Sequence, residues 1–274
     1  MIRIITDSSA DLPKNLLEGY NISVVPLRVK IEDEEYLEGI DLTPREFFEK
    51  MFSTTELPKT SQPSPAAFAE AFDECAENDE VLCLTISSGL SGTFQSACLG
   101  KELSSRNVTV FDTLAGSLAH GLQIIRAAEL AQKGHTMEEI IENLMGYRKN
   151  MNILILLDTL ENIVKGGRLS KFQGSLAKIL NIKVILEGVK GQVEMLEKIR
   201  GKKKFQKRTL EIIRERKTDF SDTIFGITHT GNEEEAERLK QEIIDLFNPK
   251  QVIVHYMGAT MGTYAGKDGM IVSF

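Results

Sequence analysis

The stretch VLCLTISSGLSGTFQSA (residues 81–97) decides the fold class of this chain. Its first six residues form a continuous apolar run, which is typical of a strand buried on both faces of a parallel sheet. The run stops at a loop of serines and glycines, and the pattern predicts a helix directly after that loop. A strand followed by a helix is the repeating unit of proteins with helices packed on a mostly parallel sheet.

Other apolar runs repeat this plan along the chain. Predicted helices alternate with them, so we expect an α/β fold with a mostly parallel sheet and helices on both of its faces. Residues 22–40 break the alternation and predict a small β excursion. The composition changes near residue 150, which predicts two domains, 1–150 and 151–274. The predicted strands cover 2–6, 81–86, 108–113, 152–159, 182–186, 223–229, 251–257 and 269–274, and the predicted helices begin near 43, 64, 117, 136 and 232.

The chain has 274 residues, of which 42% are hydrophobic and 27% charged, as is ordinary for a soluble globular protein. Its formal net charge is −7, which argues against a nucleic-acid backbone as the main partner. The run EKIRGKKKFQKR (197–208) is a local exception. It fits a solvated face at a helix start, or a docking surface for an acidic partner through Arg200, Lys202, Lys203 and Lys204.

The cysteines and the N-terminus both favour a cytoplasmic protein. Cys75, Cys83 and Cys98 are odd in number and show no CxxC spacing, so free thiols are expected, with Cys75 and Cys83 buried. The N-terminal MIRIITD meets an acid at Asp7 and lacks a signal-peptide core. No apolar run approaches the roughly 18–20 residues that a membrane span needs.

Hydroxyl side chains follow several predicted strands at the points where the strands end. Ligands of open parallel sheets bind in the crevice at that edge, so we expect these groups to gather along one rim. Gly89 and Gly92 allow a sharp turn, and a helix opening near Gly92 presents free N–H groups. With the hydroxyls of Ser88, Ser91 and Thr93, this loop suits a carboxylate or phosphate, although helix capping explains it equally well.

The same loop is close to a catalytic motif without matching it. GLSGT (89–93) has threonine where the nucleophile elbow GxSxG has its last glycine. A serine-dependent acyl-ester hydrolase using Ser91 would need partners such as Asp158 with His229 or His255. Each of those residues also fits a structural role, so the hydrolase is the alternative hypothesis.

Motifs for phosphates, dinucleotides and metals are absent. SSGLSGT (87–93) lacks the ending of a P-loop and is not GxGxxG. The four histidines show no paired ligand spacing, and capping or turn roles explain the acids Asp7, Asp112 and Asp158 at strand ends as well as a magnesium site does. We therefore expect neither a metal nor a cofactor.

Two glycine-rich stretches complete the candidate site. In KGGRLS (165–170) the glycines predict a tight turn from which Arg168 projects. Arginine offers a fixed fork of donors to a carboxylate or phosphate, and it can also bridge two loops structurally. In MGATMGTYAGKDGM (257–270), Tyr264 is a possible donor on a segment that either closes over a ligand or simply connects to the last strand.

In order and spacing, these stretches resemble the DegV family of bacterial fatty-acid-binding proteins along essentially the whole chain. The segments that carry the resemblance are TDSSADLP (6–13), TSQPSP (60–65), SSGLSGTFQSA (87–97), FDT with its following serine (111–117), DTLENIVKGGRLS (158–170) and GTYAG (262–266).

The resemblance implies a two-domain α/β protein, with a mixed sheet in the second domain. It implies a non-enzymatic carrier that holds one long-chain fatty acid between the domains and presents the carboxylate to a fatty acid kinase, which makes acyl-phosphate for phospholipid synthesis. We expect the carrier to be a monomer. The ligand residues implied by the motifs are Thr60, Ser91 and Arg168, with Ser61, Gly92, Thr93 and Tyr264 nearby.

The last segment departs from the family pattern. The family usually has a GTHxGPG-like segment there, whose histidine lies near the carboxylate. Tyr264 occupies the histidine position in this chain, and Lys267 and Asp268 replace the usual Pro-Gly character. A tyrosine still donates a hydrogen bond, so the residue keeps a place among the expected ligand groups.

Overall fold

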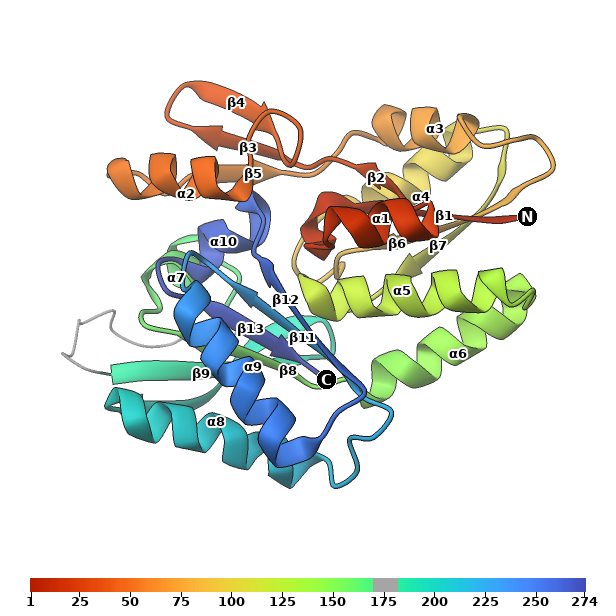
Figure 1. Cartoon of the computed structure of the whole chain (residues 1–274). Helices are drawn as coiled ribbons and strands as arrows, with labels where there is room; N and C mark the ends of the chain where they lie inside the picture. Colours follow the sequence, from red (N-terminus) through yellow and green to blue (C-terminus); the bar gives the residue numbers. More distant parts are fainter. Residues whose placement is uncertain (170–181) are drawn as a thin grey trace.

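A computed structural model describes residues 1–169 and 182–274, and these residues form three β-sheets with helices packed around them (Figure 1). Ser170, the last residue of the KGGRLS stretch, lies outside the described residues. No helix within the described ranges is long and apolar enough to cross a membrane.

The first sheet has the strand order β2-β1-β6-β7, and each neighbouring pair is parallel. The apolar run at 81–86 therefore predicted its arrangement correctly. β6 pairs on both edges and all its residues after Glu80 are buried, as a strand covered on both faces requires. The strands are β1 (Ile2–Asp7), β2 (Ser23–Val25), β6 (Glu80–Thr85) and β7 (Asn107–Asp112).

Helices cover both faces of this sheet. Leu82 and Leu84 pack with the core of α5 and α6, whereas Val81 and Cys83 pack with α3 and α4, because successive side chains of a strand point to opposite faces. Cys83 is buried and free as expected, but Cys75 is only half-buried. The helices are η1 (Ser8–Ala10), α1 (Lys14–Tyr20), α3 (Pro65–Asp73), α4 (Thr93–Leu103), α5 (Leu118–Gln132) and α6 (Met137–Asn150).

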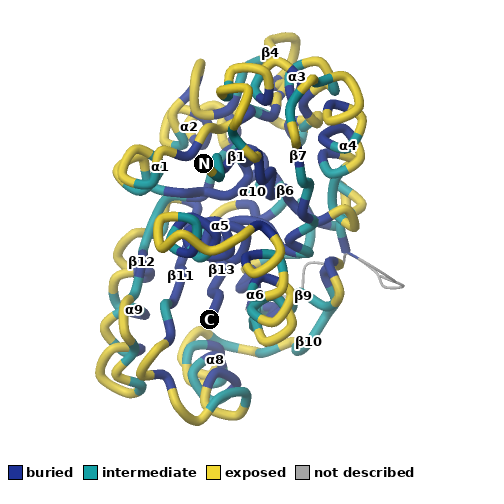
Figure 2. The backbone as a smooth tube through the Cα atoms, turned by 90° about the vertical axis from the view of Figure 1, so that its right-hand side faces the viewer, coloured by how far each residue is buried: buried dark blue, intermediate teal, exposed yellow. Residues whose placement is uncertain are grey.

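The second sheet is mixed, with the order β10-β9-β8-β13-β11-β12, in which only β11 and β12 are parallel neighbours. One face packs on α8 and α9, whose outer turns are exposed, while β11 and β13 are buried (Figure 2). The elements are β8 (Ile153–Leu157), β9 (Ile182–Val189), β10 (Gln192–Arg200), α8 (Lys202–Arg216), β11 (Ile224–His229), α9 (Glu233–Phe247), β12 (Gln251–Tyr256) and β13 (Met270–Ser273).

A small antiparallel sheet, ordered β4-β3-β5, accounts for most of the β excursion predicted at 22–40. β2 instead belongs to the parallel sheet, and β5 comes from the TSQP stretch. Three short helices lie between this sheet and the inner face of the mixed sheet. The elements are β3 (Arg28–Ile31), β4 (Glu34–Leu37), α2 (Pro44–Ser53), β5 (Lys59–Ser61), α7 (Glu161–Lys165) and α10 (Ala259–Ala265).

Helix α5 contacts strands of both large sheets. The contact is close, because a Cβ on Gly226 of β11 would lie 2.7 Å from the Cβ of Leu118. The chain passes from the elements of the parallel sheet to those of the mixed sheet between α6 and β8, at residues 150–153. The domain boundary near residue 150 stays a prediction.

Candidate functional site

A cavity of about 370 Å³ opens where the three sheets meet. This volume falls in the range of about 300–1,000 Å³ that is usual for small-molecule sites. Ile155 of β8 and Ile271 of β13 form the floor on the inner face of the mixed sheet. The remaining apolar lining comes from Leu27, Ile86, Leu90, Ile163, Val193, Met261 and Ala265. Most of the wall is therefore aliphatic.

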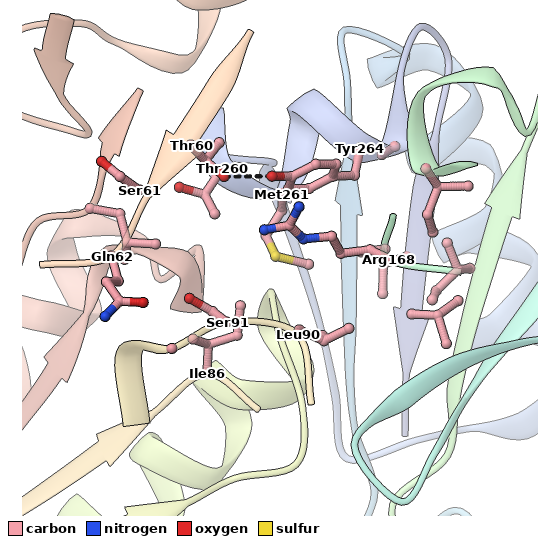
Figure 3. A pocket seen from close by; sticks show the side chains of 17 residues that line it. Thr60, Ser61, Gln62, Ile86, Leu90, Ser91, Arg168, Thr260, Met261 and Tyr264 are labelled. Atoms are coloured by element: carbon pink, nitrogen blue, oxygen red, sulfur yellow. Dashed lines mark hydrogen bonds between the residues drawn. The ribbon is translucent and has the colours of Figure 1, made fainter. Parts of the chain in front are cut away.

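Polar side chains gather at one side of this cavity. They come from four separate segments, namely β5, the loop after β6, the turn after α7, and α10 (Figure 3). The predicted rim at the carboxyl end of the parallel sheet thus supplies only the Ser91 part of the polar lining. The polar lining residues are Thr60, Ser61, Gln62, Ser91, Arg168, Thr260 and Tyr264.

Tyr264 organises this polar side. Its hydroxyl lies 2.6 Å from the hydroxyl of Thr60, and its ring lies 4.7 Å from the guanidinium carbon of Arg168. Figure 3 shows the guanidinium close to the Tyr264 ring and beside the Met261 side chain. Since an arginine stacked on an aromatic face keeps its N–H groups free for an anion, this arrangement presents a fixed donor fork to the cavity.

The turn after α7 brings Arg168 and Tyr264 together. Nη1 of Arg168 donates to the carbonyl oxygen of Gly166. A Cβ on Gly166 would lie 2.4 Å from two ring carbons of Tyr264, so only glycine lets the ring approach. Gly167 has φ +71°, a left-handed conformation that glycine adopts without strain. Glycine is therefore needed at Gly166 because of the Tyr264 ring, and it is favoured at Gly167 because of the backbone conformation.

The serine loop closes the opposite side of the cavity. Gly92 is the N-cap of α4, so the N-cap residue has no side chain with which to cap the helix. Ser91 Oγ instead lies 2.8 Å from Thr93 Oγ1 and accepts from the Thr93 amide at 3.3 Å. Thr93 is fully buried and does not line the cavity. Thr93 thus supports Ser91, whereas Ser91 and Gly92 face the cavity.

Sequence reasoning missed Gln62, Thr260 and Met261 among the lining residues. Gln62 follows the expected Thr60 and Ser61 directly, and its amide packs on Gly92, where a Cβ would lie 2.0 Å from the Gln62 Oε1. Thr260 and Met261 belong to α10. Thr260 and Tyr264 are four residues apart, a spacing that places two side chains on the same face of a helix. This spacing was the signal available in the sequence.

The whole chain, residues 1–274, matches the sequence profile of a family described as uncharacterised proteins of the DegV family. The chain belongs to the DegV family. The resemblance drawn from the sequence motifs is therefore confirmed. A DegV domain-containing protein from Caldanaerobacter subterraneus is 31% identical over 275 residues, which span 100% of this chain and 98% of that protein.

Solved structures share the fold of this DegV family chain. A DegV family protein from Thermus thermophilus, whose structure concerns its fatty acid binding, is 34% identical with a TM-score of 0.92, covering 100% of this chain and 99% of that one. DegV from Bacillus subtilis, a fatty acid binding protein, is 32% identical with a TM-score of 0.90, covering 99% and 98%. The α/β class with a parallel and a mixed sheet is confirmed.

The geometry for a hydrolase is not assembled in this DegV chain. Within residues 1–169 and 182–274, no histidine forms a hydrogen bond with Ser91. Asp158 forms an ion pair with Lys183, and the ring of His229 contacts that of Tyr256 in a tilted arrangement with ring centroids 4.4 Å apart. His229 is the last residue of β11, and neither His229 nor His255 lines the cavity.

The three strand-end acids have turn and pairing roles. Asp7 accepts from the amides of Ser9 and Ile86, and Asp112 accepts from those of Ser88 and Leu114. Across the described part of the chain, no group of three or more potential ligands is arranged for a metal ion. These carboxylates fix the loops that carry the site.

The basic run lies away from the cavity. Arg200 ends β10 and is seven residues from the lining residue Val193, which is roughly 23 Å along the strand at about 3.3 Å per residue. Lys202 forms an ion pair with Glu235 at 2.6 Å, whereas Arg200 and Lys203 are exposed. This run therefore cannot contribute to the polar side of the cavity.

Proposed function

We propose that this protein binds one long-chain fatty acid, with the acyl chain in the 370 Å³ cavity and the carboxylate at its polar side. The observation that carries the proposal is the pairing of an aliphatic wall with convergent neutral hydroxyls and a single arginine fork. Fatty acid binding by the T. thermophilus and B. subtilis relatives supports it. The proposed carboxylate ligands are Thr60, Ser61, Ser91, Gly92, Arg168 and Tyr264, with Thr93 behind Ser91.

The energetics favour a carrier over an enzyme. Burying a methylene contributes about 0.8 kcal/mol, so a long tail outweighs head-group hydrogen bonds, each of which contributes about 0.5–1.5 kcal/mol net. Holding a carboxylate needs donors but no nucleophile with a base. The lining offers such donors in five hydroxyl side chains, one carboxamide and one guanidinium, which is the chemistry of binding rather than of cleavage.

Native mass spectrometry of the purified protein, with extraction and identification of lipid, tests this proposal. We expect one fatty acid at near-equal stoichiometry. Ser91→Ala and Arg168→Ala should each weaken binding of added hexadecanoic acid by about tenfold or more, since each removes a donor to a charged group. Ser88→Ala, an exposed serine of the same loop that does not line the cavity, is the matched control. A protein that arrives empty and refuses added long-chain acids would sink the proposal.

We further propose that the bound carboxylate is presented to a separate fatty acid kinase. The kinase would transfer the terminal phosphoryl group of ATP to a carboxylate oxygen and release ADP, giving an acyl-phosphate for phospholipid synthesis. Two features support presentation. The polar side is formed partly by exposed residues such as Ser61 and Gly92, and this protein supplies no phosphate-binding motif of its own. An ATP-dependent step assigns the monomeric carrier to the cytoplasm.

We assign kinase docking to the exposed basic residues at the start of α8. Arg200, Lys202 and Lys203 are distant from the cavity, so they would hold the kinase rather than touch the carboxylate. Arg200→Glu with Lys203→Glu should slow acyl-phosphate formation and leave fatty acid affinity unchanged. Lys149→Glu, a charge reversal on exposed α6, is the control. If the kinase rate is the same in all three proteins, the basic run is only a solvated face.

A further inference from the structure

Two buried carboxylates lie on the opposite side of α10 from the fatty acid cavity. Glu38 and Asp11 are each only 6% exposed. Glu38 accepts from the Thr260 amide at 2.6 Å, from the Thr260 hydroxyl at 2.8 Å and from the Ser8 hydroxyl at 2.5 Å. At this depth solvent cannot satisfy the carboxylate oxygens of Glu38. The three protein donors therefore fix its side chain.

Asp11 holds the residue immediately before the helix. It accepts from the Gly258 amide at 2.8 Å and from the Ser117 hydroxyl at 2.5 Å. A Cβ on Gly258 would lie 2.6 Å from Glu38 Oε1 and 2.8 Å from Asp11 Oδ1, so the two carboxylates converge on one glycine. The acid pair therefore fastens the first turn of α10 to two segments, the one after η1, which carries Asp11, and the one after β4, which carries Glu38.

The same helix lines the fatty acid cavity through Thr260, Met261, Tyr264 and Ala265, so Thr260 contacts both Glu38 and the cavity. α10 has only seven residues, and isolated helices of that length are unstable in water. Its position must therefore come from tertiary contacts, among which are the hydrogen bonds that the acid pair accepts from Gly258 and Thr260 at its N-terminal end. Displacing α10 would move Tyr264 away from Thr60 and Arg168.

The surroundings leave the pair without a counter-ion. Among the described residues, neither Asp11 nor Glu38 forms a salt bridge. The charged and titratable groups around them are Asp7, Lys14, His255 and Tyr256, which line a second cavity of about 440 Å³ together with the pair. Lys14 lies at the rim with an 88% exposed side chain and pairs with Glu18.

Burial raises the pKa of both carboxyls, and the charge of Glu38 further raises the pKa of Asp11. When burial raises the pKa of a carboxyl, ionisation of that carboxyl favours any conformation in which water reaches it. The 440 Å³ cavity lies directly beside both carboxyls, so a small displacement of α10 suffices to hydrate them. Protonation of Asp11 and Glu38 therefore favours the position of α10 in this structure, which we call its closed position.

We propose that Glu38 and Asp11 are positioning residues for the fatty acid head group, and that they hold α10 closed in a proton-dependent manner. The inference rests on the proposed fatty acid binding. Neither carboxylate needs to touch the ligand for this role, because Glu38 acts through Thr260 and Asp11 acts through Gly258. Ligand affinity should fall as the pH rises through the titration of the pair.

Hexadecanol separates this effect from titration of the ligand, because it has no ionisable group near neutral pH. Its affinity, followed from pH 4 to pH 9, should fall at least threefold in the wild-type protein as the pH rises through the titration of the pair. Glu38→Gln and Asp11→Asn remove the ionisation and should each flatten that profile. Glu35→Gln, the same change at an exposed neighbour on β4, should leave the wild-type profile intact.

Thr260→Val provides a second route, because it removes the hydroxyl through which Glu38 holds the helix. Valine keeps the shape of the side chain where Thr260 lines the cavity, and the variant should weaken hexadecanol binding by about tenfold at pH 6. The inference is overturned if the hexadecanol affinity of the wild-type protein does not change with pH. It is also overturned if the Glu38→Gln and Asp11→Asn proteins show as steep a dependence on pH as the Glu35→Gln protein. Failure of the wild-type protein to bind hexadecanoic acid at all would instead overturn the proposed function.

Discussion

Tyr264 combines two interactions that a histidine would make differently. Its hydroxyl bonds to Thr60 at 2.6 Å while its ring faces the Arg168 guanidinium at 4.7 Å. A hydroxyl pair has two hydrogens and uses one internally, so one hydrogen remains for the ligand. The departure from the family pattern therefore preserves donor capacity at the polar side of the cavity.

Tyr264→Phe separates the hydroxyl from the ring. The variant keeps the stacking on Arg168 and loses one hydrogen bond, which contributes about 0.5–1.5 kcal/mol net. We expect a loss of about two- to tenfold in hexadecanoic acid affinity, measured by equilibrium titration. Tyr264→Ala should lose more, because the guanidinium is then no longer oriented. Equal losses in the two variants would mean that the ring contributes nothing.

Single residues also show what the sequence revealed about the site. Thr60, Ser91 and Arg168 were found because their motifs are local and ordered, and the structure brings all three to one cavity. Thr260 was not found, since its role depends on Glu38, which is 222 residues away in the chain. Patterns within a short window carry no information about such a pairing.

At the scale of elements, α10 is the clearest difference from expectation. The stretch MGATMGTYAGKDGM was expected to close over a ligand or to connect to the last strand, and no helix was predicted in it, in keeping with the cost of about 1 kcal/mol that glycine has in a helix relative to alanine. Tertiary contacts outweigh that cost here, and one glycine is required by them. A Cβ on Gly262 would lie 2.4 Å from the ring of Phe48. The buried strands, by contrast, were predicted well because continuous apolar runs directly encode burial on both faces.

Gly166→Ala tests the contact between the turn after α7 and α10. Gly166 has φ −74°, so alanine is allowed by the backbone, but the new methyl would overlap the Tyr264 ring at 2.4 Å. We expect a loss of about 1–3 kcal/mol in unfolding free energy, measured by urea denaturation, together with weaker fatty acid binding. Gly146→Ala in α6 has open space around it and should be neutral or stabilising. Similar effects at both positions would contradict the packing argument.

At the scale of the molecule, buried titratable groups oppose one another in their dependence on pH. The pKa of Asp11 and that of Glu38 are raised by burial, so their contribution is present below about pH 4 and is lost as the pH rises through the raised values. The pKa of His229 and that of His255 are lowered by burial, so their contribution is lost as the pH falls below about 6.5. Between about pH 4 and pH 6.5 the two contributions therefore change in opposite directions and offset one another, and above pH 6.5 only the loss from the acid pair remains.

Asp11→Asn isolates the acid side of this balance. The variant should gain unfolding free energy relative to the wild-type protein as the pH rises from 5 to 9, because it no longer buries a carboxylate that ionises. Urea denaturation at several pH values measures the difference. Asp33→Asn, at a fully exposed turn, should show no such trend. A constant difference between Asp11→Asn and the wild type across this range would refute the assignment.

The cavity lies where all three sheets meet, so a bound ligand stabilises the whole chain rather than one element. Fatty acid at 100 times its Kd should add about 2.7 kcal/mol to the unfolding free energy. In a series from C10 to C18 at one concentration, each added methylene contributes about 0.8 kcal/mol to binding only while the cavity can enclose it. Thermal unfolding should therefore shift upward with chain length and then level off. The length at which the shift stops measures the cavity, and a shift independent of length would place the acyl chain outside it.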